Sequence, residues 1–260
     1  MSNVWQVYAV RYAHHMRMGR ENFMNGDPHD DSPMPLDYYV WGLVSGNRVL
    51  VVDTGFDRPM ADRRGRTLLQ PLSAGLQTIG IEPAAVQDVL ITHMHYDHCG
   101  NHNLFPEARF HVQDREMRFV TGRHMTHAAM RIPFEEEDVV AMVRRVFNGR
   151  VVFHDGDEEI APGVSIHHVG GHTMGMQIVR VNTRRGWVVL ASDASHLYAN
   201  MEKGMPYPIA YSIGEMVEGY NRARALASSP DHVIPGHDPL VMQRYPAATP
   251  ALEGWVARLD

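Results

Sequence analysis

The sequence predicts an α/β fold, because short apolar runs typical of buried strands alternate with segments of helical periodicity. Several of these runs are continuous rather than alternating, as in sheets that are covered on both faces. Glycine and proline separate most of the segments, which places turns between them. With 260 residues, 44% of them hydrophobic, the chain can bury a sizeable core, and we expect one domain over residues 1–260.

The strands are expected where runs of β-branched and aromatic residues stand between turn signals. In chain order these runs are Val4–Val10, Tyr38–Val44, Val49–Val52, Val89–Ile91, Arg109–Val112, Val151–Phe153, Val164–Val169, Ile178–Val181, Trp187–Ala191 and Val233–Ile234. Helical periodicity predicts helices over Leu68–Ile79, Arg115–Gly122, Glu135–Phe147 and Ile213–Ser228. From Tyr245 to Leu259 we expect a turn and a short terminal helix.

Residues 14–37 show neither strand nor helical periodicity and contain many turn formers. We expect a long loop here, and such loops often border a site. Apolar side chains of the loop would then face a substrate, unless they pack in the core or the loop is a plain surface excursion. The candidates are Met16, Met18, Phe23 and Met24, together with the segment His124–His127.

Charge and composition exclude several classes of partner. The net charge is −6 with acidic and basic residues interspersed, so no cationic face is expected for nucleic acid. No apolar run approaches the roughly 18 residues that span a bilayer, and the first residues do not resemble a secretory signal. The single cysteine, Cys99, fits a reducing compartment. We therefore expect a cytoplasmic protein without membrane partners, for which a homodimer is conceivable.

A dense group of metal-binding side chains follows the apolar run Val89–Ile91. His93, His95, Asp97 and His98 stand within six residues. If the strand continued, His93, His95 and Asp97 would point to one side and His98 would turn away, so the segment could serve two adjacent ions. Nitrogen and oxygen donors without thiolates favour a catalytic site over a structural metal site or a solvated polar loop.

Three further candidate ligands each follow a predicted strand and begin a turn. They are His172, Asp193 and His237. Each is weak evidence alone, but with the first group they complete a set of seven ligands for two ions.

The order His93-x-His95-x-Asp97-His98, then His172, Asp193 and His237, resembles the metallo-β-lactamase superfamily. The resemblance runs from about Tyr38 to Asp238 and includes Asp53, which matches an early strand-turn motif. It implies an αβ/βα four-layer sandwich, in which two facing mixed sheets are covered by helices and two metals lie at one edge.

The resemblance also implies a division of the ligands. His93, His95 and His172 would hold the first metal, while Asp97, His98 and His237 would hold the second. Asp193 would bridge the two, and Asp53 would support the ligands from behind. Two divalent ions are the expected cofactors, zinc by resemblance, although iron, manganese and cobalt suit the same donors.

Within the superfamily, the motifs around His172, Asp193 and His237 resemble those of the N-acyl homoserine lactonases. This resemblance implies hydrolysis of a small lactone or ester by a metal-bridging hydroxide, because two metals lower the pKa of a shared water toward about 7. In that branch a tyrosine follows the Asp-Ala-Ser run, whereas this chain has His196, with Tyr198 as a possible substitute.

Catalysis also needs a group that protonates the leaving oxygen. The candidate catalytic residues are Asp97, Asp193, His196 and Tyr198. Alternative functions are a glyoxalase-like thioesterase and a hydrolase of another activated ring ester or aryl ether. A two-iron redox or sensing module is the alternative outside hydrolysis.

Overall fold

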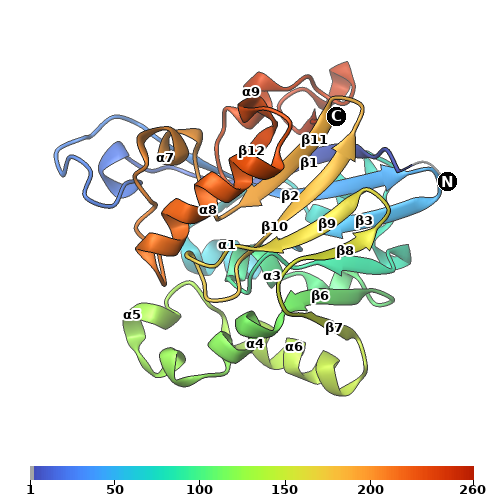
Figure 1. Cartoon of the computed structure of the whole chain (residues 1–260), viewed down its shortest axis with the longest axis horizontal. Helices are drawn as coiled ribbons and strands as arrows, with labels where there is room; N and C mark the ends of the chain where they lie inside the picture. Colours follow the sequence, from blue (N-terminus) through green and yellow to red (C-terminus); the bar gives the residue numbers. More distant parts are fainter. Residues whose placement is uncertain (1–2) are drawn as a thin grey trace.

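Two β-sheets face each other in the computed structural model, which describes residues 3–260, and helices cover their outer faces (Figure 1). This arrangement confirms the predicted αβ/βα sandwich. Among residues 3–260, no helix is long and apolar enough to cross a membrane.

The larger sheet has the strand order β13-β1-β2-β3-β5-β6-β7, and β4 pairs with β1 beside this order. The first half is antiparallel, whereas β3, β5, β6 and β7 pair in parallel. Parallel strands end at the same edge, so the residues that follow β3 and β5 meet there. The bounds are β1 Gln6–His15, β2 Leu36–Ser45, β3 Arg48–Val52, β4 Thr67–Leu68, β5 Asp88–Leu90, β6 Arg109–Gln113, β7 Val151–His154 and β13 Val256–Arg258.

The smaller sheet has the order β12-β11-β10-β9-β8. Because β10 is antiparallel to both β9 and β11, and β12 is parallel to β11, strands β9, β11 and β12 all run in one direction. The loops that follow these three strands therefore lie at one edge. The bounds are β8 Glu158–Ala161, β9 Val164–His168, β10 Gln177–Thr183, β11 Gly186–Ser192 and β12 Val233–Pro235.

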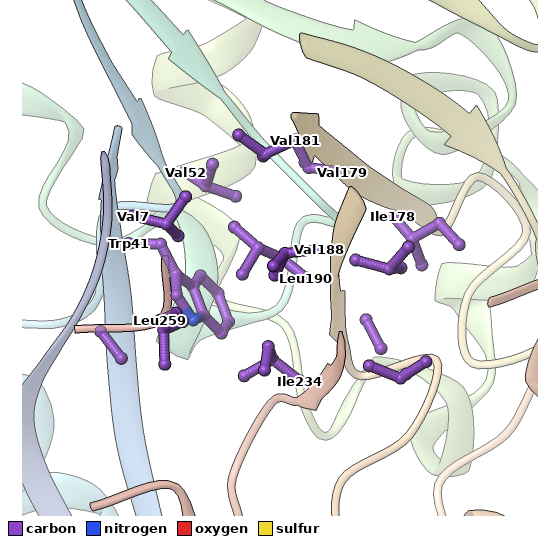
Figure 2. Packing of buried hydrophobic residues seen from close by; sticks show 14 of the residues in the cluster. Val7, Trp41, Val52, Ile178, Val179, Val181, Val188, Leu190, Ile234 and Leu259 are labelled. Carbon is purple, nitrogen blue, oxygen red and sulfur yellow. The ribbon is translucent and has the colours of Figure 1, made fainter. Parts of the chain in front are cut away.

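Apolar side chains fill the space between the sheets (Figure 2). Trp41 and Val52 enter it from the larger sheet, and Val179 and Leu190 enter it from the smaller one; all four side chains are fully buried. Burial of each such side chain contributes about 1.5–3 kcal/mol. This core fixes the two sheets relative to each other, and with them the loops at the shared edge.

The helices cover the outer faces. In Figure 1, α8 lies in front of β10 and β11, while α4 and α6 lie beside β6 and β7. A second hydrophobic core lies on the outer face of the larger sheet, and Met117 and Phe119 of α4 and Met142 of α6 pack into it. The bounds are α1 Arg58–Arg64, α2 Leu72–Gln77, α3 Tyr96–Cys99, α4 Asp114–Val120, α5 Ala128–Arg131, α6 Glu136–Phe147, α7 Tyr198–Lys203, α8 Ile213–Leu226 and α9 Val241–Arg244.

Two expected helices differ from the structure. The helix predicted from Leu68 begins only at Leu72, because Thr67–Leu68 pairs with β1 as strand β4. The predicted terminal helix is wrong: the chain forms a short 3-10 helix at Pro250–Leu252 and then β13, which pairs with β1.

Candidate metal centre

The segment rich in histidine does not continue as a strand. Strand β5 ends at Leu90, and Tyr96–Cys99 forms the short helix α3. The expectation that His93, His95 and Asp97 share one strand face is therefore wrong. The turn into α3 places Asp97 and His98 beside each other, with Nε2 of His98 3.5 Å from Oδ2 of Asp97.

The structure brings all seven candidate ligands together in two overlapping groups. Within each group, one possible ligand atom per residue lies within 4.8 Å of all the others, and every member is buried. The first group is His93, His95, His172 and Asp193, and the second is Asp97, His98, Asp193 and His237. This division is the one that the sequence resemblance implies.

Asp193 belongs to both groups because its two carboxylate oxygens face different histidines. Its Oδ2 lies 3.3 Å from Nε2 of His172, in the first group. Its Oδ1 lies 2.9 Å from Nε2 of His237 and 3.2 Å from Nε2 of His98, in the second. One carboxylate can therefore reach two neighbouring ions.

Hydrogen bonds on the outer side of the rings direct the free nitrogens inward. Nδ1 of His172 lies 2.8 Å from the carbonyl oxygen of Ile209, and Nδ1 of His237 lies 2.9 Å from that of Asp37. A carbonyl oxygen only accepts, so each Nδ1 carries the proton and leaves Nε2 with a free lone pair. This tautomer is the one that a metal ligand needs.

Asp53 holds His98 from behind in the same way. It is fully buried, and its Oδ2 lies 2.7 Å from Nδ1 of His98. The backbone N–H and the hydroxyl of Thr92 donate to the two oxygens of Asp53. Asp53 itself has a φ of 64°, a left-handed conformation that a non-glycine residue adopts at a cost. The sequence motif pointed to this supporting position.

Glu116 is a buried residue near the site that the sequence reading missed. It accepts from the backbone N–H of Met94, from the hydroxyl of Thr173 and from the backbone N–H of Gly175. It thereby joins the loop that carries His95 to the loop that carries His172. No sequence signal marks it, because its partners come from segments that are distant in the chain.

The polar atoms of this centre fit a pair of metal cations. Nε2 of His98 and Oδ1 of Asp193 are buried and have no hydrogen bond among residues 3–260. In the first group, Nδ1 of His95 lies 3.0 Å from Nε2 of His93 and 2.9 Å from Nε2 of His172. Burial lowers the pKa of His93 and His95 well below the usual value, so both are neutral donors. In the second group burial opposes protonation, but Asp193 and Asp97 raise the pKa of His98 and His237, so protons and cations compete for the same place. Imidazole nitrogens and carboxylate oxygens that converge in this way are a donor set that divalent metals bind.

Five of the seven candidate ligands line a small pocket of about 70 Å³, namely His95, Asp97, His172, Asp193 and His237. The predicted loop over residues 14–37 is shorter in the structure, because β1 continues to His15 and β2 begins at Leu36. Arg17 of this loop lines the pocket, whereas its apolar candidates do not, and Met16 is 63% exposed. The pocket is lined by Arg17, Leu36, Tyr38, Arg66, His95, Tyr96, Asp97, Pro133, His172, Asp193, His196, Tyr207, Ile209 and His237.

The two remaining sequence candidates have different positions. His196 lines the pocket, with Nε2 3.0 Å from Oδ2 of Asp193, and burial lowers its pKa to about 3. Tyr198 does not line the pocket, since its ring packs under the guanidinium of Arg244. The tyrosine that stands in the pocket is Tyr207, whose ring stacks on His196 at 3.7 Å. The sequence reading missed it because it lies eleven residues beyond His196, after α7.

Comparison with known proteins gives a family match over most of the chain. The sequence pattern of the metallo-beta-lactamase superfamily matches residues 34–237. An N-acyl homoserine lactonase of a Bacillus species is 29% identical over 133 residues, 51% of this chain and 48% of that protein. The N-acyl homoserine lactonase AiiB of Agrobacterium fabrum is 30% identical over 177 residues, 63% of this chain and 60% of that protein. The chain thus spans about half the length of the first of these curated relatives.

Solved structures show the same fold. The crystal structure of a quorum-quenching N-acyl homoserine lactone lactonase superposes with a TM-score of 0.75 at 20% identity, covering 91% of this chain and 93% of the other. AidC, a dizinc quorum-quenching lactonase in complex with a product, superposes with a TM-score of 0.69 at 13% identity, covering 91% and 89%.

Proposed function

Because the chain belongs to the metallo-beta-lactamase superfamily, we propose that it is a two-metal hydrolase that opens the ester ring of a lactone. The observation that carries this proposal is the pair of buried four-residue groups that share Asp193, which lines a pocket. A single carboxylate that faces both groups can hold two ions close enough to act on one substrate.

Each residue then has a defined task. His93, His95 and His172 would hold one metal, Asp97, His98 and His237 the other, and Asp193 would bridge them. Zinc is our proposal for both ions, since the similar fold of AidC is described as dizinc and the donors are nitrogen and oxygen. Two such ions supply Lewis acidity and lower the pKa of bound water, so a nucleophile is available near neutral pH.

The residues around the ligands would position the substrate. Burial raises the pKa of Tyr207, so its hydroxyl stays protonated and can donate to a substrate oxygen. We propose that Tyr207 takes the place that sequence reasoning gave to Tyr198. Asp97, Asp193 and His196 remain the candidates for carrying a proton to the leaving oxygen, because all three line the pocket. His196 is neutral near pH 7, so it would first have to accept that proton.

An acyl homoserine lactone is the first substrate to test, since the curated relatives are N-acyl homoserine lactonases. A second pocket of about 290 Å³ joins the first at His95 and His172, and Phe119, Met130 and Phe134 form part of its wall. Apolar walls next to the proposed metals suit an acyl chain.

The test measures lactone ring opening by pH-stat titration, on protein whose metal content has been determined. The panel contains acyl homoserine lactones of several lengths, other lactones, thioesters and nitroaryl esters. We expect lactone turnover that a chelator abolishes and added metal restores. Turnover confined to thioesters or to aryl substrates, with two metals bound, would reject the lactonase proposal in favour of those alternatives. The cytoplasmic location and the homodimer stay predictions.

A further inference from the structure

Two arginine side chains line the pocket that holds the proposed metal ligands. Arg17 comes from the loop between β1 and β2, and Arg66 follows α1, so the two reach the pocket from separate segments. Both are half-buried. Acidic residues outnumber lysine and arginine in this chain by 30 to 24, yet neither guanidinium forms an ion pair among residues 3–260.

Hydrogen bonds fix Arg17 while leaving part of its guanidinium free. Nε donates to Oδ1 of Asn22 at 2.9 Å, and Nη2 donates to the carbonyl oxygen of Glu21 at 2.6 Å. The group also lies over the ring of Tyr207, 5.2 Å from its centre. Nη1 has no hydrogen bond within the part of the chain that the structure describes.

Arg66 is held in a comparable way. Its Nε donates to the hydroxyl of Tyr96 at 3.0 Å, and its Nη1 donates to the carbonyl oxygen of Arg64 at 2.5 Å. Its Nη2 forms no hydrogen bond with any residue from 3 to 260. Both arginines are therefore oriented before any ligand arrives, which reduces the entropy lost on binding.

The charge of the pocket favours an anionic ligand. Asp97 and Asp193 are the carboxylates among its lining residues, and both face the histidines. With two divalent cations bound, those two carboxylates leave an excess of positive charge, to which the arginines add. A neutral substrate would leave two half-buried guanidiniums without a counter-ion.

We propose that Arg17 and Arg66 form an anion subsite, and that the substrate of this pocket carries a carboxylate in addition to its scissile ester. A planar guanidinium matches a carboxylate in geometry as well as in charge. The inference rests on the proposed hydrolase function and narrows its substrate class, from lactones in general to acidic lactones.

The experiment compares lactones that differ only in this charge. The probes are N-succinyl homoserine lactone and γ-butyrolactone γ-carboxylic acid, each beside its neutral carboxamide. We expect the metal-loaded protein to show a kcat/KM for at least one acid that is about 10- to 100-fold higher than for its amide, the range for one or two charge-assisted hydrogen bonds. Arg17→Gln and Arg66→Gln should reduce this preference, because the kcat/KM of the acid should fall by a larger factor than that of the amide.

Two variants serve as controls. Arg118→Gln removes an exposed arginine of α4 that does not line the pocket, and it should keep the preference. Arg66→Lys keeps the positive charge but loses the planar guanidinium that binds a carboxylate with two hydrogen bonds. It should therefore retain part of the preference that Arg66→Gln loses. If Arg66→Gln does not fold, Arg17→Gln and the acid-to-amide ratio of the unmodified protein decide the question.

A measurement of binding without turnover tests the anion subsite separately from the proposed lactonase activity. Calorimetric titration with the γ-lactam analogues of the same probes, whose ring amide resists hydrolysis, needs no turnover. The acid should bind more tightly than its neutral carboxamide in the unmodified protein but not in the glutamine variants. Equal turnover and equal binding of acid and amide would overturn the anion subsite while leaving a lactonase intact. A binding preference without any lactone turnover would retain the subsite and reject the lactonase.

Discussion

Two buried clusters of histidine and aspartate in this molecule differ in how many donor atoms converge. At the candidate metal centre, two groups of four donors share Asp193. In the second cluster, Nε2 of His102 lies 4.0 Å from Oδ1 of Asp138, beside a pocket of about 330 Å³. Each cluster contains buried polar atoms without a hydrogen bond among the described residues, including Nδ1 of His102 and Oδ2 of Asp138.

The two clusters differ in the protonation states that their buried side chains adopt. Burial lowers the pKa of His102 to about 3 and raises the pKa of Asp138 to about 7. Both shifts favour the neutral form, so this contact is not an ion pair despite its short distance. At the metal centre the neighbouring imidazoles of His196 and His237 instead hold the pKa of Asp193 well below its usual range, against the effect of burial. A cation can satisfy the first cluster, whereas a proton is sufficient for the second.

Removal of the metals should have the largest effect on activity and stability, and this effect should come from the candidate metal centre rather than from the second cluster. We expect chelation to abolish activity and to lower the free energy of unfolding by about 4 kcal/mol for each ion, relative to protein at a free metal concentration near 1,000 times the dissociation constant. Thermal unfolding with and without chelator, alongside metal analysis, measures this. An unchanged melting temperature on metal removal would contradict the idea that cations stabilise the centre.

Asp193→Asn should weaken both groups at once, because each of them uses one oxygen of this carboxylate. We expect metal affinity to fall by more than about 100-fold, beyond what loss of an outer partner causes. Metal content after dialysis and lactone turnover are the measurements. Asp138→Asn is the matched control in the second cluster and should keep both metals; if Asp193→Asn also keeps both, its bridging role is rejected.

Asp53→Asn should affect one group more than the other, since Asp53 contacts His98 and no other proposed ligand at hydrogen-bond distance. We expect about 10- to 100-fold weaker binding of the metal in the group of His98. A metal titration that resolves the two sites tests this. Asp88→Asn removes a comparable partner from His111, 3.0 Å away and outside the site, and should leave both affinities unchanged.

Asp138→Asn should have the smallest effect, and the effect should depend on pH. The folded pKa of about 7 is above the ordinary value of 3.8, so the unfolded chain loses this proton first and stability falls as the pH rises between these values. At pH 8 the variant should be more stable than the unmodified protein by about 1–2 kcal/mol, with almost no difference near pH 4. This is less than the roughly 4 kcal/mol of the full pKa shift, because Asp138 lines a pocket in which water screens part of its charge. Urea unfolding at both pH values measures it, with exposed Glu137→Gln as control. A gain of equal size at both pH values would show that ionisation is not the cause.

The sequence predicted the parts of the fold that rest on local patterns. Strands such as Ile178–Val181 and Trp187–Ala191 were visible because most of their residues are apolar and buried, with Arg180 as the one charged residue. Strand β8 was missed because Glu158 and Glu159 are exposed at the edge of the smaller sheet and give no apolar signal. Helix α1 was missed because four of its seven residues are charged.

For the site, all seven proposed ligands could be found because each stands in a short motif at a strand end. Arg17, Arg66, Tyr207 and Glu116 could not be found in the same way. Each reaches the site from a segment with no motif of its own, and only the packing of the two sheets brings those segments together.

The ligands come from both sheets, and this has a consequence for how the protein folds. His93, His95, Asp97 and His98 follow β5 of the larger sheet, whereas His172, Asp193 and His237 follow strands of the smaller one. Closing such long loops costs entropy, and contacts between distant segments form late in folding. The complete metal centre can therefore form only after the sheets have docked, so the rate of metal uptake during refolding reports the rate of docking. Two ions bound there would cross-link the halves of the sandwich, and we expect them to slow its opening.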